Sequence, residues 1–196
     1  MSSKIEVGLS PVKSFLQYLF DNCANGLEFL DREGIRDTPR RIVSAWKEAL
    51  SGYYLKPEDL LKTSFSEDFG NYDQIILLKN IEFVSTCEHH FLPFYGKVHV
   101  GYLPNGKVLG ISKIARLVEC FARRLQIQER ITEQIKVQLD KALKPRGVGV
   151  IIEAKHFCVT SRGIKKQKAK MVTSAFSGIF LEENSIRNEF LNLVKK

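Results

Sequence analysis

Ser85-Thr86-Cys87-Glu88-His89-His90-Phe91 places a thiol, a carboxylate and two imidazoles in four consecutive residues. Such side chains bind borderline-soft metals and transfer protons. The runs 74–78 and 81–85 are rich in branched residues, which predicts strands that lead into this stretch. Cys87 and His90 stand three residues apart, so in a turn both can reach one metal ion. The sequence therefore predicts a metal-binding turn after a strand.

A second cluster, His156-Phe157-Cys158, lies much later in the chain. Alternation of residue types over 148–155 predicts a strand before it. In a strand, side chains alternate between the two faces, so His156 and Cys158 are expected on one face. The two clusters are thus expected to converge on one site.

Three of the four histidines fall in these clusters. We expect Cys87, His90 and Cys158 to bind the metal, which leaves His89 and His156 for proton transfer. Three protein ligands with an open position describe a catalytic Zn²⁺ site, whereas four ligands describe a structural one. The alternative is that the cysteines are small buried hydrophobic residues and the histidines are satisfied polar groups.

The composition of the 196-residue chain, 44% hydrophobic and 27% charged, is typical of one globular domain with room for a small appended one. No apolar run is long enough to span a membrane, and the N-terminus lacks the apolar core of a signal peptide. We therefore expect a cytoplasmic protein with no membrane contact. Four irregularly spaced cysteines favour thiols and metal over disulfides there.

The net charge of +8 favours an anionic partner. Nucleic acid is one candidate and a small phosphorylated substrate is another, while scattered surface charge is the plain alternative. The sequence has no aromatic-rich RNA-binding signature and no paired zinc-finger spacing. Five of the ten residues in 161–170 are cationic, so this loop is either solvated or forms an anion-binding rim near the metal site.

Helical spacing of apolar residues predicts a helix over 12–25 and another that begins at Thr38-Pro39 and ends near Gly52. Arg40 and Arg41 lie in the first turn of the second helix, where the macrodipole disfavours cations. Either one of them serves an anion or both have a plain surface role. Ser112 is expected to cap a third helix. Lys113 and Arg116 share a face near its start, where they either bind a phosphate or serve solubility.

The remaining elements are predicted from turn signals and periodicity. Residues 96–103 form an expected strand, and Asn105-Gly106 predicts a two-residue hairpin to 108–110. A helix is expected from Gln126 to Leu143. A final strand over 172–181 and a helix over 182–196 complete the chain.

Five motifs occur in one order along the chain. They are Cys87-Glu88-His89-His90-Phe91, Gly110-Ile111-Ser112-Lys113-Ile114-Ala115-Arg116, Gln126-Ile127-Gln128-Glu129-Arg130, His156-Phe157-Cys158 with Arg162-Gly163, and the segment 31–41. Together they resemble the GTP cyclohydrolase I family over residues 30–181. Five motifs in register make this resemblance highly specific.

The resemblance implies zinc-dependent hydrolytic opening of the guanine imidazole ring of GTP. The products would be formate and 7,8-dihydroneopterin triphosphate, in the first step of pterin and folate biosynthesis. It assigns the zinc ion to Cys87, His90 and Cys158, in agreement with the choice from spacing. It also assigns proton transfer to His89 and His156.

Substrate contacts are likewise implied by the resemblance. Glu129 is similar to the family's guanine anchor, a carboxylate that accepts hydrogen bonds from the base, and Gln128 matches a neighbouring binding position. The implied ribose and triphosphate contacts are Ser112, Lys113, Arg116, Arg162 and Arg41. Ala169 and Met171 depart from the pattern, since relatives often carry Ser and Thr there.

The implied architecture is the tunnelling fold (T-fold), an α+β unit whose antiparallel sheet has helices on one side. Residues 1–55 would form an N-terminal helical extension and residues 56–196 the catalytic domain. The family assembles as a homodecamer of two pentamers, with active sites at subunit contacts.

Two other classes of function stay open at this point. A binding module on a structural metal, with nucleic acid as its partner, would need a fourth ligand from Glu88 or His89. A different tunnelling-fold enzyme acting on a purine or pterin would keep Glu129 but change the chemistry. The two cysteines beside the histidines weigh against the second class.

Overall fold

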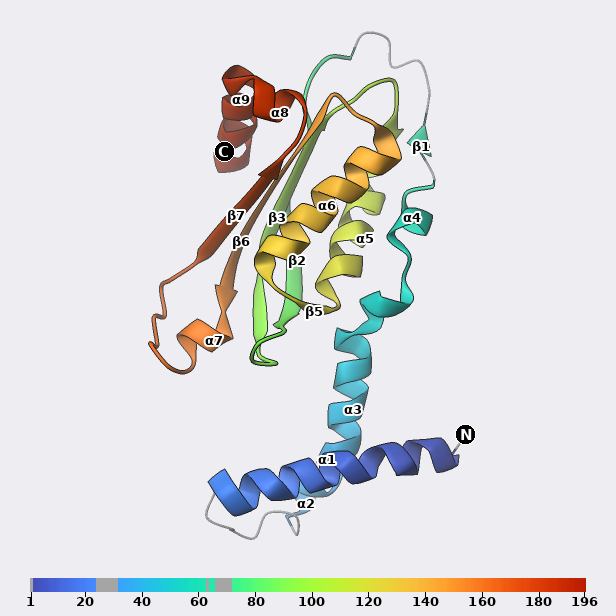
Figure 1. Cartoon of the computed structure of the whole chain (residues 1–196), viewed down its shortest axis with the longest axis vertical. Coiled ribbons are helices and arrows are strands. Elements are labelled where there is room, and N and C mark those ends of the chain that lie inside the picture. The colour runs from blue at the N-terminus through green and yellow to red at the C-terminus, as the bar shows by residue number, and fades with distance from the viewer. Residues whose placement is uncertain (1, 24–31, 63, 66–71) are drawn as a thin grey trace. The chain divides into compact units, whose positions relative to one another are not determined.

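The computed structural model describes residues 2–23, 32–62, 64–65 and 72–196 (Figure 1). Contacts divide the chain into two compact units, Met1–Leu50 and Ser51–Lys196. The helices of the first unit are α1 Ser2–Cys23, α2 Glu33–Arg36 and α3 Thr38–Ala49. None of the described helices is long and apolar enough to cross a lipid bilayer.

In the first unit, α1 packs against α3. The predicted helix over 12–25 begins too late, because α1 starts at Ser2 and runs through Pro11. Pro39 lies in the first turn of α3 as predicted, although the N-cap is Asp37 rather than Thr38. The end of the predicted helix, residues 24–25, and the first residue of the segment 31–41 lie outside the described part of the chain.

The second unit is built on a five-stranded sheet. Its first elements are η1 Ser51–Tyr54, α4 Pro57–Leu60 and β1 Ser64–Phe65. The strands of the sheet are β2 Ile76–Cys87, β3 Pro93–Leu103, β5 Leu125–Gln126, β6 Gly147–His156 and β7 Met171–Phe176. Their order is β5-β2-β3-β6-β7, with antiparallel β2–β3, β3–β6 and β6–β7 pairs and a parallel β2–β5 pair.

Helices α5 Ile111–Ala122 and α6 Gln128–Leu143 cover one face of this sheet (Figure 1). Val148, Val150 and Ile152 alternate along β6 and are all fully buried in the core beneath these helices. The helices supply Leu117, Ile131, Ile135 and Leu139 to the same core. The expected α+β fold, with an antiparallel sheet and helices on this face, is confirmed.

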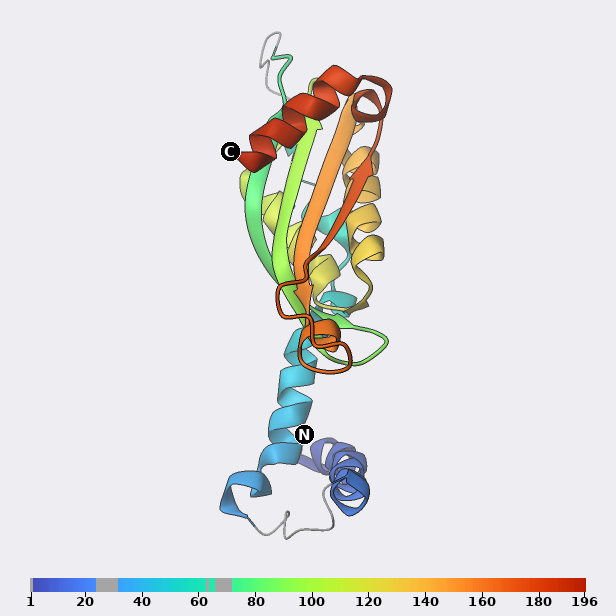
Figure 2. The ribbon, with the colours of Figure 1, turned by 90° about the vertical axis from the view of Figure 1, so that its left-hand side faces the viewer.

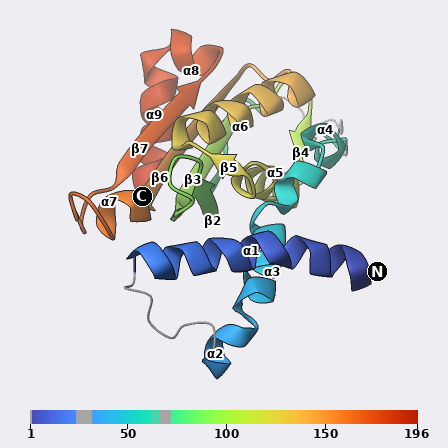
Figure 3. The ribbon, with the colours of Figure 1, turned by 60° about the horizontal axis from the view of Figure 1, so that its bottom comes forward.

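The C-terminal helices α8 Ile179–Glu182 and α9 Asn184–Lys195 cover part of the opposite face (Figures 2 and 3). The ring of Phe190 approaches the backbone so closely that a Cβ at Gly101 would lie 2.7 Å from it. The predicted final strand is too long. It ends at Phe176, and Gly178 then turns the chain with a φ of 50°.

Two further strand predictions need correction. The predicted hairpin at Asn105-Gly106 is wrong, because β4 Val108–Leu109 pairs with β1 and not with β3. A turn signal fixes the local bend but not the partner strand. The two predicted strands over 74–78 and 81–85 are one strand, β2, with an irregularity between Leu78 and Ile81 where Asn80 has a φ of 58°.

Candidate active site

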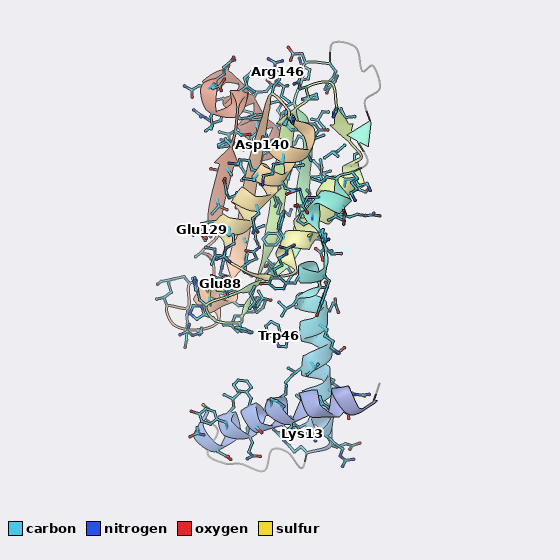
Figure 4. The ribbon with its side chains drawn as sticks, turned by 45° about the vertical axis from the view of Figure 1, so that its right-hand side comes forward. Lys13, Trp46, Glu88, Glu129, Asp140 and Arg146 are labelled. Carbon is cyan, nitrogen blue, oxygen red and sulfur yellow. The ribbon has the colours of Figure 1, made fainter. Side chains whose placement is uncertain are left out.

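One end of the sheet brings together the β2–β3 turn, β5, the start of α6 and the end of β6 (Figure 1). Cys87 lies opposite Gln126 across the β2–β5 pair. The predicted helix from Gln126 is therefore shorter, since residues 125–126 form β5 and α6 begins at Gln128. Figure 4 shows Glu88 and Glu129 toward this end and Arg146 toward the other.

Cys87, His90 and Cys158 form a group that could hold a metal ion. Their ligand atoms all lie within 4.8 Å of one another. Cys87 Sγ is 3.7 Å from His90 Nδ1. The amides of His90 and Phe91 both donate to the Cys87 carbonyl, at 3.4 and 2.9 Å, so a tight turn holds the first two ligands together.

The route by which Cys158 reaches this group differs from the prediction. Strand β6 ends at His156, and α7 Phe157–Thr160 follows as a single helical turn. Strand alternation therefore does not extend to Cys158. The helical turn, rather than a shared strand face, brings its thiol beside Cys87.

The chemistry of the group suits a borderline-soft cation. Burial, together with the neighbouring Cys87 sulfur, raises the pKa of the Cys158 thiol. A bound metal ion replaces the thiol protons and compensates for two adjacent thiolates. Two sulfurs and an imidazole are ligands that Zn²⁺ prefers. In the described part of the chain, neither Glu88 nor His89 belongs to the group, so a fourth ligand for a structural site is not at hand.

Glu88, between the ligands, is held by a residue to which the sequence analysis gave no role. Both terminal nitrogens of Arg130 donate to its carboxylate, at 2.5 and 3.0 Å. The Arg130 hydrogen bond lowers the pKa of the Glu88 carboxyl. The amide of Glu88 donates to the Gln126 carbonyl at 3.0 Å. The Cys87–His90 turn is thus anchored to β5 and to the first turn of α6.

His156 lies at the end of β6 and is half-buried. The ring stacks on Phe94, its cross-strand partner, with centroids 4.5 Å apart and 4° between the planes. Its Nε2 is 2.9 Å from Gln128 Oε1. Burial lowers the pKa of His156, and the carboxylate of Glu129 opposes this shift. Gln128 itself is only 1% exposed.

The other predicted site residues of this end are open to solvent. His89 is exposed, and its ring lies 6.2 Å from that of His90, nearly perpendicular to it. Glu129 is an exposed carboxylate in the first turn of α6, near His156. Arg162 is exposed in the loop after α7, and its charge acts on Cys158 by opposing the rise in pKa.

Three predicted substrate residues of the second unit are not brought to the group formed by Cys87, His90 and Cys158. Ser112, Lys113 and Arg116 lie in the first half of α5, whose other end leads to β5. A twelve-residue helix is roughly 18 Å long, so most of its length separates the first turn from this end. The N-cap of α5 is Gly110 rather than Ser112.

Arg41 belongs to the first unit, where its guanidinium donates to the Gly34 carbonyl at 3.3 Å and lies 3.8 Å from the Asp37 carboxylate. Its role stays a prediction.

Known proteins resemble this chain along most of its length. The sequence profile of GTP cyclohydrolase I matches residues 24–195. A protein of Wolinella succinogenes, GTP cyclohydrolase 1, is 51% identical over 164 residues, which cover 84% of this chain and 87% of that protein. A protein of the same name from Methylococcus capsulatus is 47% identical over 182 residues, covering 92% and 97%.

A third relative, the GTP cyclohydrolase 1 of Chlorobium chlorochromatii, is 48% identical over 166 residues, covering 84% of this chain and 73% of that protein. Identity near one half over most of each sequence, together with a profile match that runs almost to the C-terminus, shows that the chain belongs to the GTP cyclohydrolase I family of enzymes.

Proposed function

We propose that this protein hydrolyses GTP, opening the imidazole ring of guanine to release formate and form 7,8-dihydroneopterin triphosphate. The convergence of Cys87, His90 and Cys158 beside His156 is the observation that carries the proposal. These residues lie at one end of the sheet, where they would serve as metal ligands and as a proton-transfer group, and membership of the family supports GTP as the substrate.

Cys87, His90 and Cys158 would hold Zn²⁺. Bound there, Zn²⁺ would make water a stronger nucleophile at neutral pH. The turn at Cys87–His90 and the helical turn α7 support this assignment, because they hold the three candidate ligand atoms within 4.8 Å of one another. Three ligands leave a position for water, in keeping with a catalytic site rather than a structural one.

His156 and His89 would hold and transfer the protons. The burial of His156 favours its neutral ring, which can accept a proton and return it to a ring nitrogen of the substrate. His89 differs, because it is exposed on the turn between Cys87 and His90 and faces bulk water. The two residues therefore suit different steps, one inside the site and one at its edge.

Glu129 would recognise guanine. Its carboxylate is exposed next to His156, so it can accept hydrogen bonds from the two donors on the Watson–Crick edge of the base. Adenine would leave this carboxylate without its donors, which is a strong basis for discrimination. Gln128, the second predicted base contact, has a side-chain amide that already forms hydrogen bonds within the protein.

A second copy of the chain would complete the phosphate site. Arg162 is close to Cys158, whereas Ser112, Lys113 and Arg116 lie toward the far end of α5. A site completed across a subunit contact would use both sets, together with Arg41. This supports a homo-oligomer, which we propose to be a decamer of two pentamers. Pterin and folate biosynthesis in the cytoplasm remains the expected setting.

The test is to incubate the purified, metal-analysed protein with GTP and to measure formate and the fluorescence of the oxidised pterin. We expect both products, their loss on chelation and their return with Zn²⁺. Cys158→Ser should abolish formate release with little change in the fold. Cys23→Ser, which alters an exposed cysteine of the first unit, is the matched control. Unchanged turnover by Cys158→Ser would exclude the proposed metal site.

A further inference from the structure

The ring of His156 is held in one orientation by contacts on two sides. Phe94 stacks on its face, and Gln128 Oε1 lies 2.9 Å from its Nε2. Stacking fixes the plane of the ring and the Gln128 contact fixes its rotation within that plane. Which atom carries the proton in this contact depends on which way the Gln128 amide points.

The surroundings of Gln128 decide the orientation of its amide. Its Nε2 is 3.1 Å from the carbonyl oxygens of Ile152 and Met171, and 3.1 Å from Thr173 Oγ1. Carbonyl oxygens only accept hydrogen bonds. Rotating the amide by half a turn would place Oε1 against two carbonyl oxygens, neither of which can donate a proton to it. The amide nitrogen therefore faces the strands, and the amide oxygen faces His156.

Two threonine hydroxyls support this orientation independently. Thr132 Oγ1 donates to the Gln128 carbonyl at 2.7 Å, so its only proton is used. Thr132 Oγ1 and Thr173 Oγ1 are also 2.7 Å apart, and Thr173 must be the donor of that bond. The Thr173 oxygen is then left to accept from Gln128 Nε2. The amide nitrogen, whose two protons are shared among three acceptors, therefore faces Thr173, because an amide oxygen in that place would meet a hydroxyl whose proton is already used.

We infer that Gln128 is a positioning residue that holds His156 as its Nε2–H tautomer and leaves Nδ1 as the nitrogen that exchanges protons with the substrate. The amide oxygen of Gln128 can only accept, so His156 Nε2 must donate. In the neutral ring, Nδ1 then carries the lone pair. The second half of this inference rests on the proposed function, but the tautomer follows from the hydrogen bonds alone.

This role differs from the base contact that the family resemblance implied for Gln128. The side chain is 1% exposed and its amide already has partners on both ends. A substrate-binding residue mainly affects KM, because its contact forms when the substrate binds. A positioning residue mainly affects kcat, because the substrate still binds while the proton is offered from the wrong atom.

Neutron diffraction from deuterium-exchanged crystals of the full chain, grown where imidazoles are neutral, tests the tautomer directly. We expect deuterium at His156 Nε2, directed at Gln128 Oε1, and none at Nδ1. Deuterium at Nδ1, alone or with Nε2, would overturn the inference whether or not the protein makes formate. If Nε2 alone is deuterated but GTP is not hydrolysed, the tautomer stands and the proposed function fails.

Kinetics of variants separate positioning from substrate binding. Gln128→Met should lower kcat on the order of 100-fold, the usual scale for a lost proton-transfer group, with a much smaller effect on the KM for GTP. Because Gln128→Met could fail to fold, Thr173→Val offers a milder change that removes the hydroxyl accepting from Gln128 Nε2. A fall in kcat of roughly tenfold is expected, with recovery in Thr173→Ser. A rise in KM at unchanged kcat would instead establish a binding role.

Discussion

Arg130 donates hydrogen bonds from two nitrogens to the carboxylate of Glu88, at 2.5 and 3.0 Å. The pair connects the first turn of α6 to the residue that follows Cys87. Planar two-point contacts of this kind fix geometry as well as charge. Both side chains are partly exposed, so the pair contributes orientation rather than much stability. The Arg130–Glu88 pair therefore supports the group of Cys87, His90 and Cys158 without including any of these three residues.

Arg130→Met should therefore weaken metal binding more than it weakens the fold. Without the guanidinium, Glu88 no longer holds the Cys87–His90 turn against α6, and we expect a loss of zinc affinity of roughly tenfold. Competition with a chromophoric chelator measures the affinity, and urea unfolding of the metal-free protein measures the fold. Lys136→Met, which breaks the Lys136–Glu133 pair on the same helix, is the matched control. Equal zinc affinities for the two variants would contradict the positioning role.

Zinc should protect one cysteine from modification. Cys23 is exposed and Cys158 half-buried, whereas Cys87 and Cys120 are buried. After chelation, a thiol reagent should label Cys23 first and Cys158 more slowly, because burial raises the pKa of the Cys158 thiol and the thiolate is the reactive form. Labelling of Cys158 should accelerate as the pH rises. Adding Zn²⁺ should suppress it without affecting Cys23.

Peptide mass spectrometry reads out this labelling at each cysteine. His90→Ala offers an independent check, since removal of one ligand should abolish the protection of Cys158 by zinc. Labelling of Cys158 at the same rate with and without Zn²⁺ would show that its thiol is not a ligand.

The sequence was most informative where chemistry is local. Cys87 and His90 are three residues apart, and a turn between them is enough to bring them together. Cys158 lies beside Cys87 and His90 as the sequence predicts, but by another route, because it is on a helical turn rather than on a strand. Its role as a metal ligand stays a prediction. Its thiol chemistry and its neighbouring histidine identified it, and the path of the backbone did not.

Contacts between distant segments could not be read in the same way. The Arg130–Glu88 pair depends on the parallel pairing of β5 with β2, and a two-residue strand leaves little periodicity. The partners of Gln128 lie on β6 and β7, so they follow from the register of both strands. One signal was available, because Gln128 and Thr132 are four apart and therefore share a helix face. The buried position of that face required the structure.

Gly101 should be intolerant of even one methyl group. A Cβ there would lie 2.7 Å from the Phe190 ring, which docks α9 on the sheet. We expect Gly101→Ala to lower the free energy of unfolding by about 1–3 kcal/mol, the range for overpacking a filled core. Urea denaturation followed by fluorescence gives the value. Gly34→Ala, where an added Cβ meets nothing within 4 Å, is the comparison. Similar changes in the free energy of unfolding for the two variants would mean that α9 can shift away from the sheet at little cost.

His99 should make stability depend on pH away from the metal site. Its ring is buried on β3, and its Nδ1 accepts from the Asn80 amide at 3.4 Å, at the irregularity of β2. Burial lowers the pKa of His99 below its ordinary value of 6.5. Lys97 and Lys79 act in the same direction and Glu153 opposes them.

The pKa of His99 is lower in the folded protein than in the unfolded chain. Between the folded pKa and 6.5, the unfolded chain therefore binds more protons than the folded protein. Stability contributed by the neutral ring is present above 6.5 and is lost as the pH falls through this window. His99→Gln removes the titration while its amide oxygen can still accept from Asn80. The urea midpoint of the wild type should therefore fall more than that of His99→Gln as the pH drops below 6.5, so that the two midpoints converge. A difference that stays constant with pH would mean that His99 titrates alike in the folded and unfolded chains.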